Sequence, residues 1–147
     1  MNLGLENKNI IISGGAKGIG ASIASLVAQE GANAIIIGRN SDDNQKMVSS
    51  IISEGGKADF VTAELSDPVA CQKAIETIVE RYKSIDGLVN NAGENDGVGL
   101  EKGNYDAFVK SLHKNLIHYY LLAHHALPYL IRTKGAIVNI SSKTADT

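Results

Sequence analysis

Hydrophobic positions along this chain alternate between short continuous runs and longer stretches in which apolar residues recur every three or four positions. The continuous runs predict strands buried on both faces, because a solvent-facing strand would alternate apolar and polar residues. The longer stretches predict amphipathic helices. Predicted strands lie at 10–12, 34–38, 57–62, 86–90 and 135–141, and predicted helices at 18–30, 42–54, 68–82 and 104–132.

Local signals set the ends of these helices. Asp67 followed by Pro68 predicts an N-cap and a proline at the first helical position. Ser41 or Asp42 is expected to cap the second helix, and Gly31 to end the first. The predicted inward-facing residues are Ile19, Ile23, Leu26 and Val27, then Met47, Val48, Ile51 and Ile52, then Cys71, Ala74, Ile75, Ile78 and Val79.

Five strands separated by helices predict an α/β fold with a doubly wound parallel sheet and helices on both faces, which is a Rossmann-like arrangement. No internal repeat, low-complexity tract or linker divides the sequence. Residues 1–147 are therefore expected to form one domain.

Composition narrows the function classes. A net charge of -2 with scattered basic residues gives no electrostatic case for nucleic acid or an anionic membrane. The longest apolar stretch, 119–131, is too short to span a bilayer and is broken by histidines and Pro128. A single cysteine, Cys71, cannot form an internal disulfide, which favours a cytoplasmic setting. Cys71 is expected to pack in the interior and not to act as a nucleophile.

A glycine-rich turn follows the first strand and opens the first helix. Gly14, Gly18 and Gly20 are spaced as glycine, three residues, glycine, one residue, glycine. Glycines let backbone N–H groups approach a pyrophosphate without an intervening side chain, and the following helix presents its N-terminus to the same anion. This strand–turn–helix context predicts a dinucleotide site, and no Gly-Lys-Ser/Thr ending indicates a Walker loop.

Four motifs in order along the chain resemble the short-chain dehydrogenase/reductase family. They are the glycine turn, Asn-Asn-Ala-Gly at 90–93, Asn115 on the long helix, and Asn-Ile-Ser-Ser at 139–142. Within that family, residues 91–99 and 142–145 are most similar to sugar dehydrogenases acting on L-fucose-type aldoses. The resemblance implies hydride transfer between a nicotinamide cofactor and a small alcohol or sugar.

The resemblance also implies roles for individual residues. Ser142 would hydrogen-bond the reacting oxygen, and Asn115 would hold a water in a proton relay. Glu64 stands where the family usually has aspartate for the adenine amino group, and it is one methylene longer. The implied cofactor-binding residues are Gly14, Lys17, Gly18, Ile19, Gly20, Arg39, Glu64, Leu65, Asn91, Ala92 and Gly93.

The end of the second strand favours NADP, although NAD stays possible. An acidic residue there would accept the 2′-hydroxyl of NAD, but this chain has Gly38 and Arg39. Arg39 offers a planar donor fork suited to a phosphate, and Lys17 could add a second charge. Asp42 and Asp43 come slightly too late to replace the missing carboxylate.

No metal site is expected. The four histidines, His113, His118, His124 and His125, all fall on the long helix without the pairs three or four apart that helical metal sites use. Tyrosines on the same helix are expected to pack or to form an interface.

The resemblance implies that the five predicted strands are the first five of the family's fold and that its carboxy-terminal part is missing. The family's acid/base tyrosine, followed four residues later by a lysine, has no counterpart in residues 1–147. We therefore expect little or no dehydrogenase activity from this chain, which could be a fragment or the product of an interrupted gene. A catalytically silent nucleotide-binding protein is the alternative. Strand 136–140 is expected to form an open apolar edge, and 116–120 an uncovered helix face, so we expect oligomers through one of them.

Overall fold

A computed structural model describes residues 2–142 of the chain. Its five strands form one parallel sheet in the order β3-β2-β1-β4-β5. The elements are β1 Asn9–Ser13, α1 Gly18–Gln29, β2 Asn33–Gly38, α2 Ser41–Ser53, β3 Lys57–Thr62, α3 Pro68–Tyr82, β4 Gly87–Asn90, α4 Tyr105–Leu112, the π-helical turn η1 His113–Ile117, α5 His118–Thr133 and β5 Ala136–Asn139.

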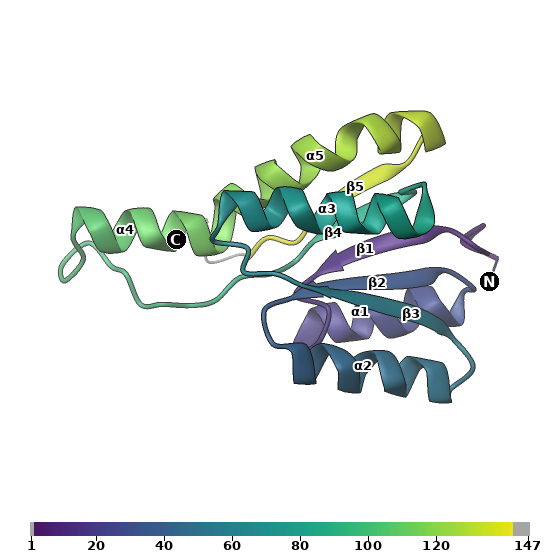
Figure 1. Cartoon of the computed structure of the whole chain (residues 1–147). Coiled ribbons are helices and arrows are strands. Elements are labelled where there is room, and N and C mark those ends of the chain that lie inside the picture. Colours follow the sequence, from purple (N-terminus) through teal and green to yellow (C-terminus); the bar gives the residue numbers. More distant parts are fainter. Residues whose placement is uncertain (1, 143–147) are drawn as a thin grey trace.

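Helices cover both faces of this sheet, which confirms the predicted doubly wound α/β fold. Figure 1 shows α1 and α2 on one face and α3 with α5 on the other. The isoleucines of β1 and β2 alternate between the two faces: Ile11 and Ile35 belong to the core under α3 and α5, whereas Ile12 and Ile36 belong to the core under α1 and α2. Continuous apolar runs in these strands therefore reflect burial on both sides.

The inward face of α3 was predicted correctly, but two other helices differ. Cys71, Ala74, Ile75 and Ile78 are all buried. Ile19 and Leu26 of α1 are instead 64% and 60% exposed, and Ile52 of α2 is 55% exposed. The predicted inward positions of these three residues are wrong.

Small residues explain the difference in α1. The residues of α1 that are buried are Gly20, Ala24 and Ala28, so this helix packs on the sheet through its smallest side chains. A helix that approaches a sheet through glycine and alanine lies close to it, and its large residues are then pushed to the flanks. Apolar spacing alone does not distinguish these two faces.

Side-chain caps begin three of the helices. Asp67 accepts a hydrogen bond from the Val69 N–H at 2.9 Å, as predicted for α3. The second helix is capped by Asn40, whose Oδ1 accepts from the Asp43 N–H at 3.0 Å, so the predicted caps Ser41 and Asp42 are wrong by one or two positions. Asn104 caps α4 in the same way.

The predicted single helix over 104–132 is interrupted by the π-helical turn η1. Within this turn, the Asn115 Nδ2 donates to the carbonyl oxygen of Ser111 at 3.1 Å. A side chain that takes a carbonyl four residues back competes with the backbone N–H for that acceptor, and single π turns of this kind are frequent at functional sites. Pro128 lies inside α5.

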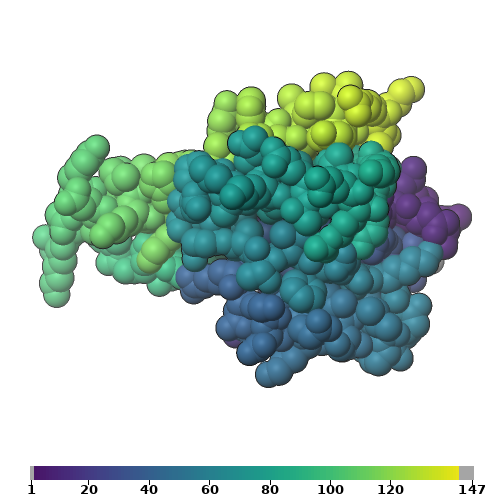
Figure 2. Space-filling view, viewed as in Figure 1, coloured from purple at the N-terminus to yellow at the C-terminus, as the bar shows by residue number. Residues whose placement is uncertain are grey.

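β5 forms one edge of the sheet, and all of its residues are exposed. Ile137 is 40% and Val138 50% exposed, and on the neighbouring helix Leu116 and Tyr120 are 58% and 68% exposed. The predicted open edge and uncovered helix face are therefore present. Figure 2 shows α4 and the loop before it standing off from the body of the domain.

Cys71 occupies the interior as predicted. Its side chain is fully buried, and its thiol donates to the Leu65 carbonyl oxygen at 3.3 Å. Burial raises the pKa of this thiol to about 11, with the Asp67 carboxylate adding to the effect. A thiol so strongly protonated at neutral pH is a packing group and a poor nucleophile.

Candidate functional site

A pocket of about 490 Å³ opens at the carboxyl ends of the parallel strands, next to the point between β1 and β4 where the strand order reverses. In doubly wound sheets this crevice is where ligands bind. Ile37 and Gly38 of β2 contribute to the pocket, together with residues that directly follow β1, β3 and β4. Its lining consists of Gly14, Ala16, Lys17, Ile19, Ile37, Gly38, Arg39, Asn40, Asp43, Asn44, Ala63, Glu64, Leu65, Ser66, Asn91, Ala92, Gly93, Glu94, Lys114 and His118.

The β1–α1 turn is fastened to the end of β4 by buried polar contacts. The Ser13 hydroxyl oxygen accepts the backbone N–H groups of Asn91 at 2.9 Å and Ala92 at 3.1 Å. In return, the Asn91 Nδ2 donates to the carbonyl oxygens of Ser13 at 3.1 Å and Gly14 at 3.3 Å. These contacts bring the two predicted motifs together on the pocket floor.

Glycine is required where the turn meets β4 and α1. Gly14 has a φ of +66°, and a Cβ there would lie 2.9 Å from the Ala92 Cα. A Cβ on Gly20 would collide with the Gly14 carbonyl oxygen. Neither position has room for a side chain, so the backbone of the turn lies directly against the end of β4 and the start of α1.

The N-terminus of α1 differs from those of α2, α3 and α4. Each of those three has a side-chain cap, whereas Lys17 at the N-cap of α1 makes no capping hydrogen bond. The first N–H groups of a helix have no partners within it and carry partial positive charge. With Ile19 in the lining and Gly18 at the first helical position, this end of α1 is suited to a phosphate group.

Cationic side chains on the pocket rim are paired with carboxylates. The Lys17 Nζ lies 2.8 Å from Oδ2 of Asp43, and an Arg39 guanidinium nitrogen lies 3.2 Å from Oε2 of Glu94. The sequence places Asp43 slightly too late to replace the missing carboxylate at the end of β2, and in the structure Asp43 pairs with Lys17. It lines the pocket because Asn40 starts α2 immediately after β2 and turns its first residues back toward the turn.

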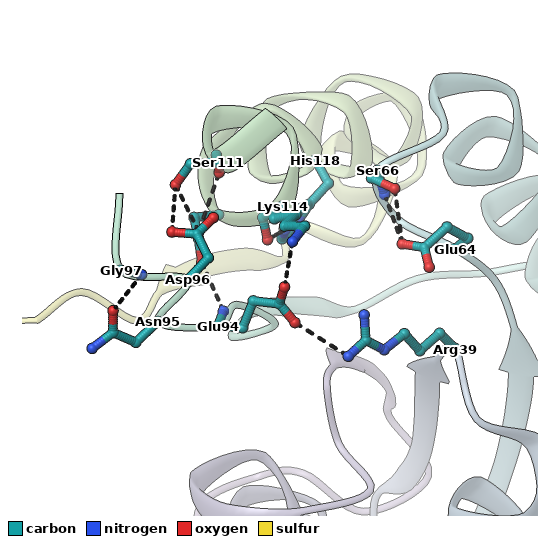
Figure 3. A network of polar contacts seen from close by, with 11 residues as sticks. Arg39, Glu64, Ser66, Glu94, Asn95, Asp96, Gly97, Ser111, Lys114 and His118 are labelled. Carbon is teal, nitrogen blue, oxygen red and sulfur yellow. Dashed lines mark hydrogen bonds and ion pairs between the residues drawn. The ribbon is translucent and has the colours of Figure 1, made fainter. Parts of the chain in front are cut away.

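Glu94 joins three elements around the pocket, as Figure 3 shows. Its other carboxylate oxygen lies 2.7 Å from the Lys114 Nζ, and its backbone N–H donates to Oδ1 of Asn115 at 2.7 Å. The Lys114 ammonium and, more weakly, Arg39 hold the pKa of the Glu94 carboxyl below its usual value. Glu94 therefore stays ionised through the neutral range.

All but two of the remaining predicted cofactor residues also line the pocket. Leu65, Ala92 and Gly93 belong to its walls. The Glu64 carboxylate, predicted for the adenine amino group, accepts from the Ser66 hydroxyl at 2.9 Å and the Ser66 N–H at 3.2 Å, as Figure 3 also shows. Gly18 and Gly20 support the turn from outside the lining.

Ser142 and Asn115, predicted as catalytic, lie outside the lining. Ser142 is exposed, beyond the end of β5, and Asn115 is held between Glu94 and Ser111. The Tyr119 hydroxyl donates to the Ile140 carbonyl oxygen at 2.9 Å and so fixes the chain just before Ser142. Residues 143–145, part of the sugar-dehydrogenase resemblance, lie outside the described residues.

Sequence reasoning missed Ser13, Glu94 and Lys114, and it did not foresee that Asp43 pairs with Lys17. Glu94 and Lys114 each adjoin a recognised motif, directly after Gly93 and directly before Asn115, so their neighbours could have drawn attention to them. Their charges meet only because the loop after β4 crosses the π turn. Ser13 could have been noticed as a polar residue at the end of an apolar strand.

His118 was considered only as a metal ligand, and no group of three or more metal-binding side chains occurs among residues 2–142. Its ring is 1% exposed and lines the pocket. Nε2 lies 2.7 Å from the Lys114 carbonyl oxygen, so this nitrogen carries the proton. Burial lowers the pKa of His118 below its ordinary value of 6.5, against smaller opposing effects of that carbonyl and of Glu64.

This lowered pKa predicts acid sensitivity. As the pH decreases below about 6.5, His118 becomes protonated in the unfolded chain before it does in the folded chain. The unfolded state then binds more protons, so the free energy of unfolding decreases as the pH decreases, by at most about 1.4 kcal/mol per pH unit. Urea unfolding between pH 7.5 and about 5 should show a smaller loss of stability for His118→Gln than for the wild type. His124→Gln, which changes an exposed ring, should leave the wild-type slope unchanged; equal slopes for all three proteins would refute this assignment.

Comparison with known proteins agrees with this architecture. A family model described as short chain dehydrogenase matches residues 8–147. The 3-oxoacyl-[acyl-carrier-protein] reductase of Chlamydia pneumoniae is 28% identical over 146 residues, which cover 99% of this chain and 59% of that protein. The chain thus spans little more than half the length of this curated relative. No helix within residues 2–142 is long and apolar enough to cross a membrane.

Two similar solved structures contain dinucleotides. A metagenomic short-chain oxidoreductase in complex with NADP has a TM-score of 0.88 and 28% identity, covering 94% of this chain and 63% of the other. An NADH-dependent reductase, A1-R′, complexed with NAD has a TM-score of 0.91 and 27% identity, covering 99% of this chain and 63% of the other. With the matched family model over nearly its whole length, this chain belongs to the short-chain dehydrogenase family.

Proposed function

We propose that this chain is the cofactor-binding part of an NADP-dependent short-chain oxidoreductase that acts on a small alcohol or sugar. The observation that carries the proposal is the β1–α1 turn, where glycines pack against β4 and an uncapped helix N-terminus faces the pocket. Its backbone N–H groups would hold the pyrophosphate, because Gly14 and Gly18 carry no side chain and the N-terminus of α1 has no side-chain cap.

The other pocket residues would each bind a different part of the dinucleotide: the adenine, the ribose or the 2′-phosphate. Glu64 and Leu65 would flank the adenine, with Glu64 able to turn from Ser66 to an amino group. Asn91 and Ala92 would form the floor beneath the ribose, held there by Ser13. Arg39 would bind a 2′-phosphate with its planar donor fork, and Lys17 would support it.

A bound nicotinamide would supply hydride transfer. Ser142 would donate to the oxygen of the alcohol or carbonyl and stabilise the charge that develops there. The Asn115 amide oxygen takes one hydrogen bond from Glu94 and keeps a second lone pair, which would hold the relay water. A reducing, cytoplasmic setting fits a single buried thiol.

Arg39 provides the first test. Arg39→Met should weaken NADPH binding by roughly tenfold or more, since it removes charged hydrogen bonds to the 2′-phosphate, and should change NADH binding little. Fluorescence titration of the folded chain with each dinucleotide measures both constants. Lys110→Met, which removes a cation from α4, is the matched control. Tighter binding of NADH than NADPH by the wild type would contradict the NADP preference.

Turnover should be low, because no tyrosine in the 147 residues is followed four positions later by a lysine. Absence of general acid/base help costs about 10²–10⁴-fold. Assays with NADP and a panel of aldoses and alcohols should therefore give rates at least that far below those of a full-length relative. Comparable rates would show that another group in this chain moves the proton.

Association should occur through the edge formed by β5 and the adjoining helix face. Unpaired strand edges with apolar side chains favour pairing with another chain. Light scattering is expected to detect oligomers of the wild type, and Val138→Lys should reduce them. Val69→Lys adds the same charge to an exposed valine on α3 and serves as the control. A stable monodisperse monomer with a cooperative melt would overturn this expectation.

A further inference from the structure

The cation placed to select the cofactor already has a counter-ion. Arg39 is the guanidinium at the end of β2, and its NH2 nitrogen lies 3.2 Å from Oε2 of Glu94, which arrives from the loop after β4. Figure 3 shows the Glu94 carboxylate between Arg39 and Lys114. The acidic residue that the sequence lacks at the end of β2 is thus supplied in space by a residue 55 positions later.

Glu94 is held in this position by its surroundings. Its backbone N–H is bound by Asn115, its second carboxylate oxygen pairs with Lys114 at 2.7 Å, and Asn115 is itself anchored to Ser111. The carboxylate is also half-buried, with 35% of its side chain exposed. These contacts at its backbone and its head group place the negative charge of Glu94 beside Arg39 at the pocket rim.

A carboxylate at this position disfavours binding of the 2′-phosphate of NADP in two ways. The phosphate must compete with it for the Arg39 donor fork, and the two anions repel each other across the rim. Neither cost arises for the 2′-hydroxyl of NAD, which a carboxylate can accept directly. Glu94 is therefore expected to change the affinity for NADP relative to NAD, because the two cofactors differ only at this 2′ position.

We propose that Glu94 is a specificity-determining residue that, as the counter-ion of Arg39, lowers the affinity of this pocket for NADP relative to NAD. Lys114 moderates the effect by holding the other oxygen of the same carboxylate. This inference rests on the proposed cofactor site. It implies that the affinity for NADP exceeds the affinity for NAD by a smaller factor than Arg39 alone would give.

The test compares NADPH and NADH dissociation constants of the full chain and its variants. Glu94→Gln keeps the shape and much of the hydrogen bonding while removing the charge, and it should tighten NADPH binding about two- to fivefold with little change for NADH. Glu101→Gln removes an exposed carboxylate from the same loop and should leave both constants unchanged. Circular dichroism establishes that each variant is folded.

Lys114 gives a second, independent arm. Lys114→Met frees the Glu94 carboxylate for Arg39, so it should weaken NADPH binding in the wild-type background and have little effect when Glu94→Gln is already present. An equal effect in both backgrounds would show that Lys114 does not act through Glu94 and would overturn that part of the proposal.

These measurements test the role of Glu94 separately from the proposed dinucleotide site on which it rests. A folded wild type that binds neither NADPH nor NADH refutes the cofactor site itself. Saturable binding with the same ratio of NADPH to NADH constants in Glu94→Gln and Glu101→Gln leaves the cofactor site standing and refutes the role of Glu94. A shift in that ratio confined to Glu94→Gln supports it.

Discussion

The shape of the pocket floor depends on the close approach of the turn after β1 to the end of β4. The Ser13 hydroxyl binds two N–H groups of the β4 end, and Asn91 returns two hydrogen bonds to the turn. All four contacts are wholly or partly buried, where an unpaired polar group would be costly. They fix a distance at which only glycine fits at positions 14 and 20. Packing alone thus requires glycine at these two positions, apart from the proposed role in binding phosphate.

The fold could be predicted well because its signals are local. Continuous isoleucine runs mark the central strands, and Asp67 with Pro68 marks the start of α3 at the correct residue. The errors come from information that local pattern lacks. Ile19 and Leu26 have helical spacing suited to burial, but α1 approaches the sheet through Gly20, Ala24 and Ala28. The π turn at 113–117 contains Asn115, whose side chain donates to the Ser111 carbonyl oxygen, and periodicity does not register such a contact.

The residues that line the pocket could largely be predicted, whereas the ion pairs between them could not. Nine of the predicted residues line the pocket, because they belong to motifs that the parallel topology gathers at one edge: Gly14, Lys17, Ile19, Arg39, Glu64, Leu65, Asn91, Ala92 and Gly93. Glu94 and Asp43 were missed as partners of Arg39 and Lys17. Ion pairs between residues far apart in sequence depend on the course of loops, which no spacing rule describes. The roles of Ser142 and Asn115 stay predictions, since Asn115 is bound to Glu94 and Ser111 outside the lining.

The central claim is that the turn between β1 and α1 holds the phosphates of a dinucleotide. It is tested most directly by following backbone amide resonances while the folded chain is titrated with NADPH. The account predicts saturable shifts that are largest at residues 14–20 and 91–93, with Gly55 at the far end of α2 unaffected. A folded chain whose amides at 14–20 do not respond, while NADPH binds elsewhere or not at all, would contradict it.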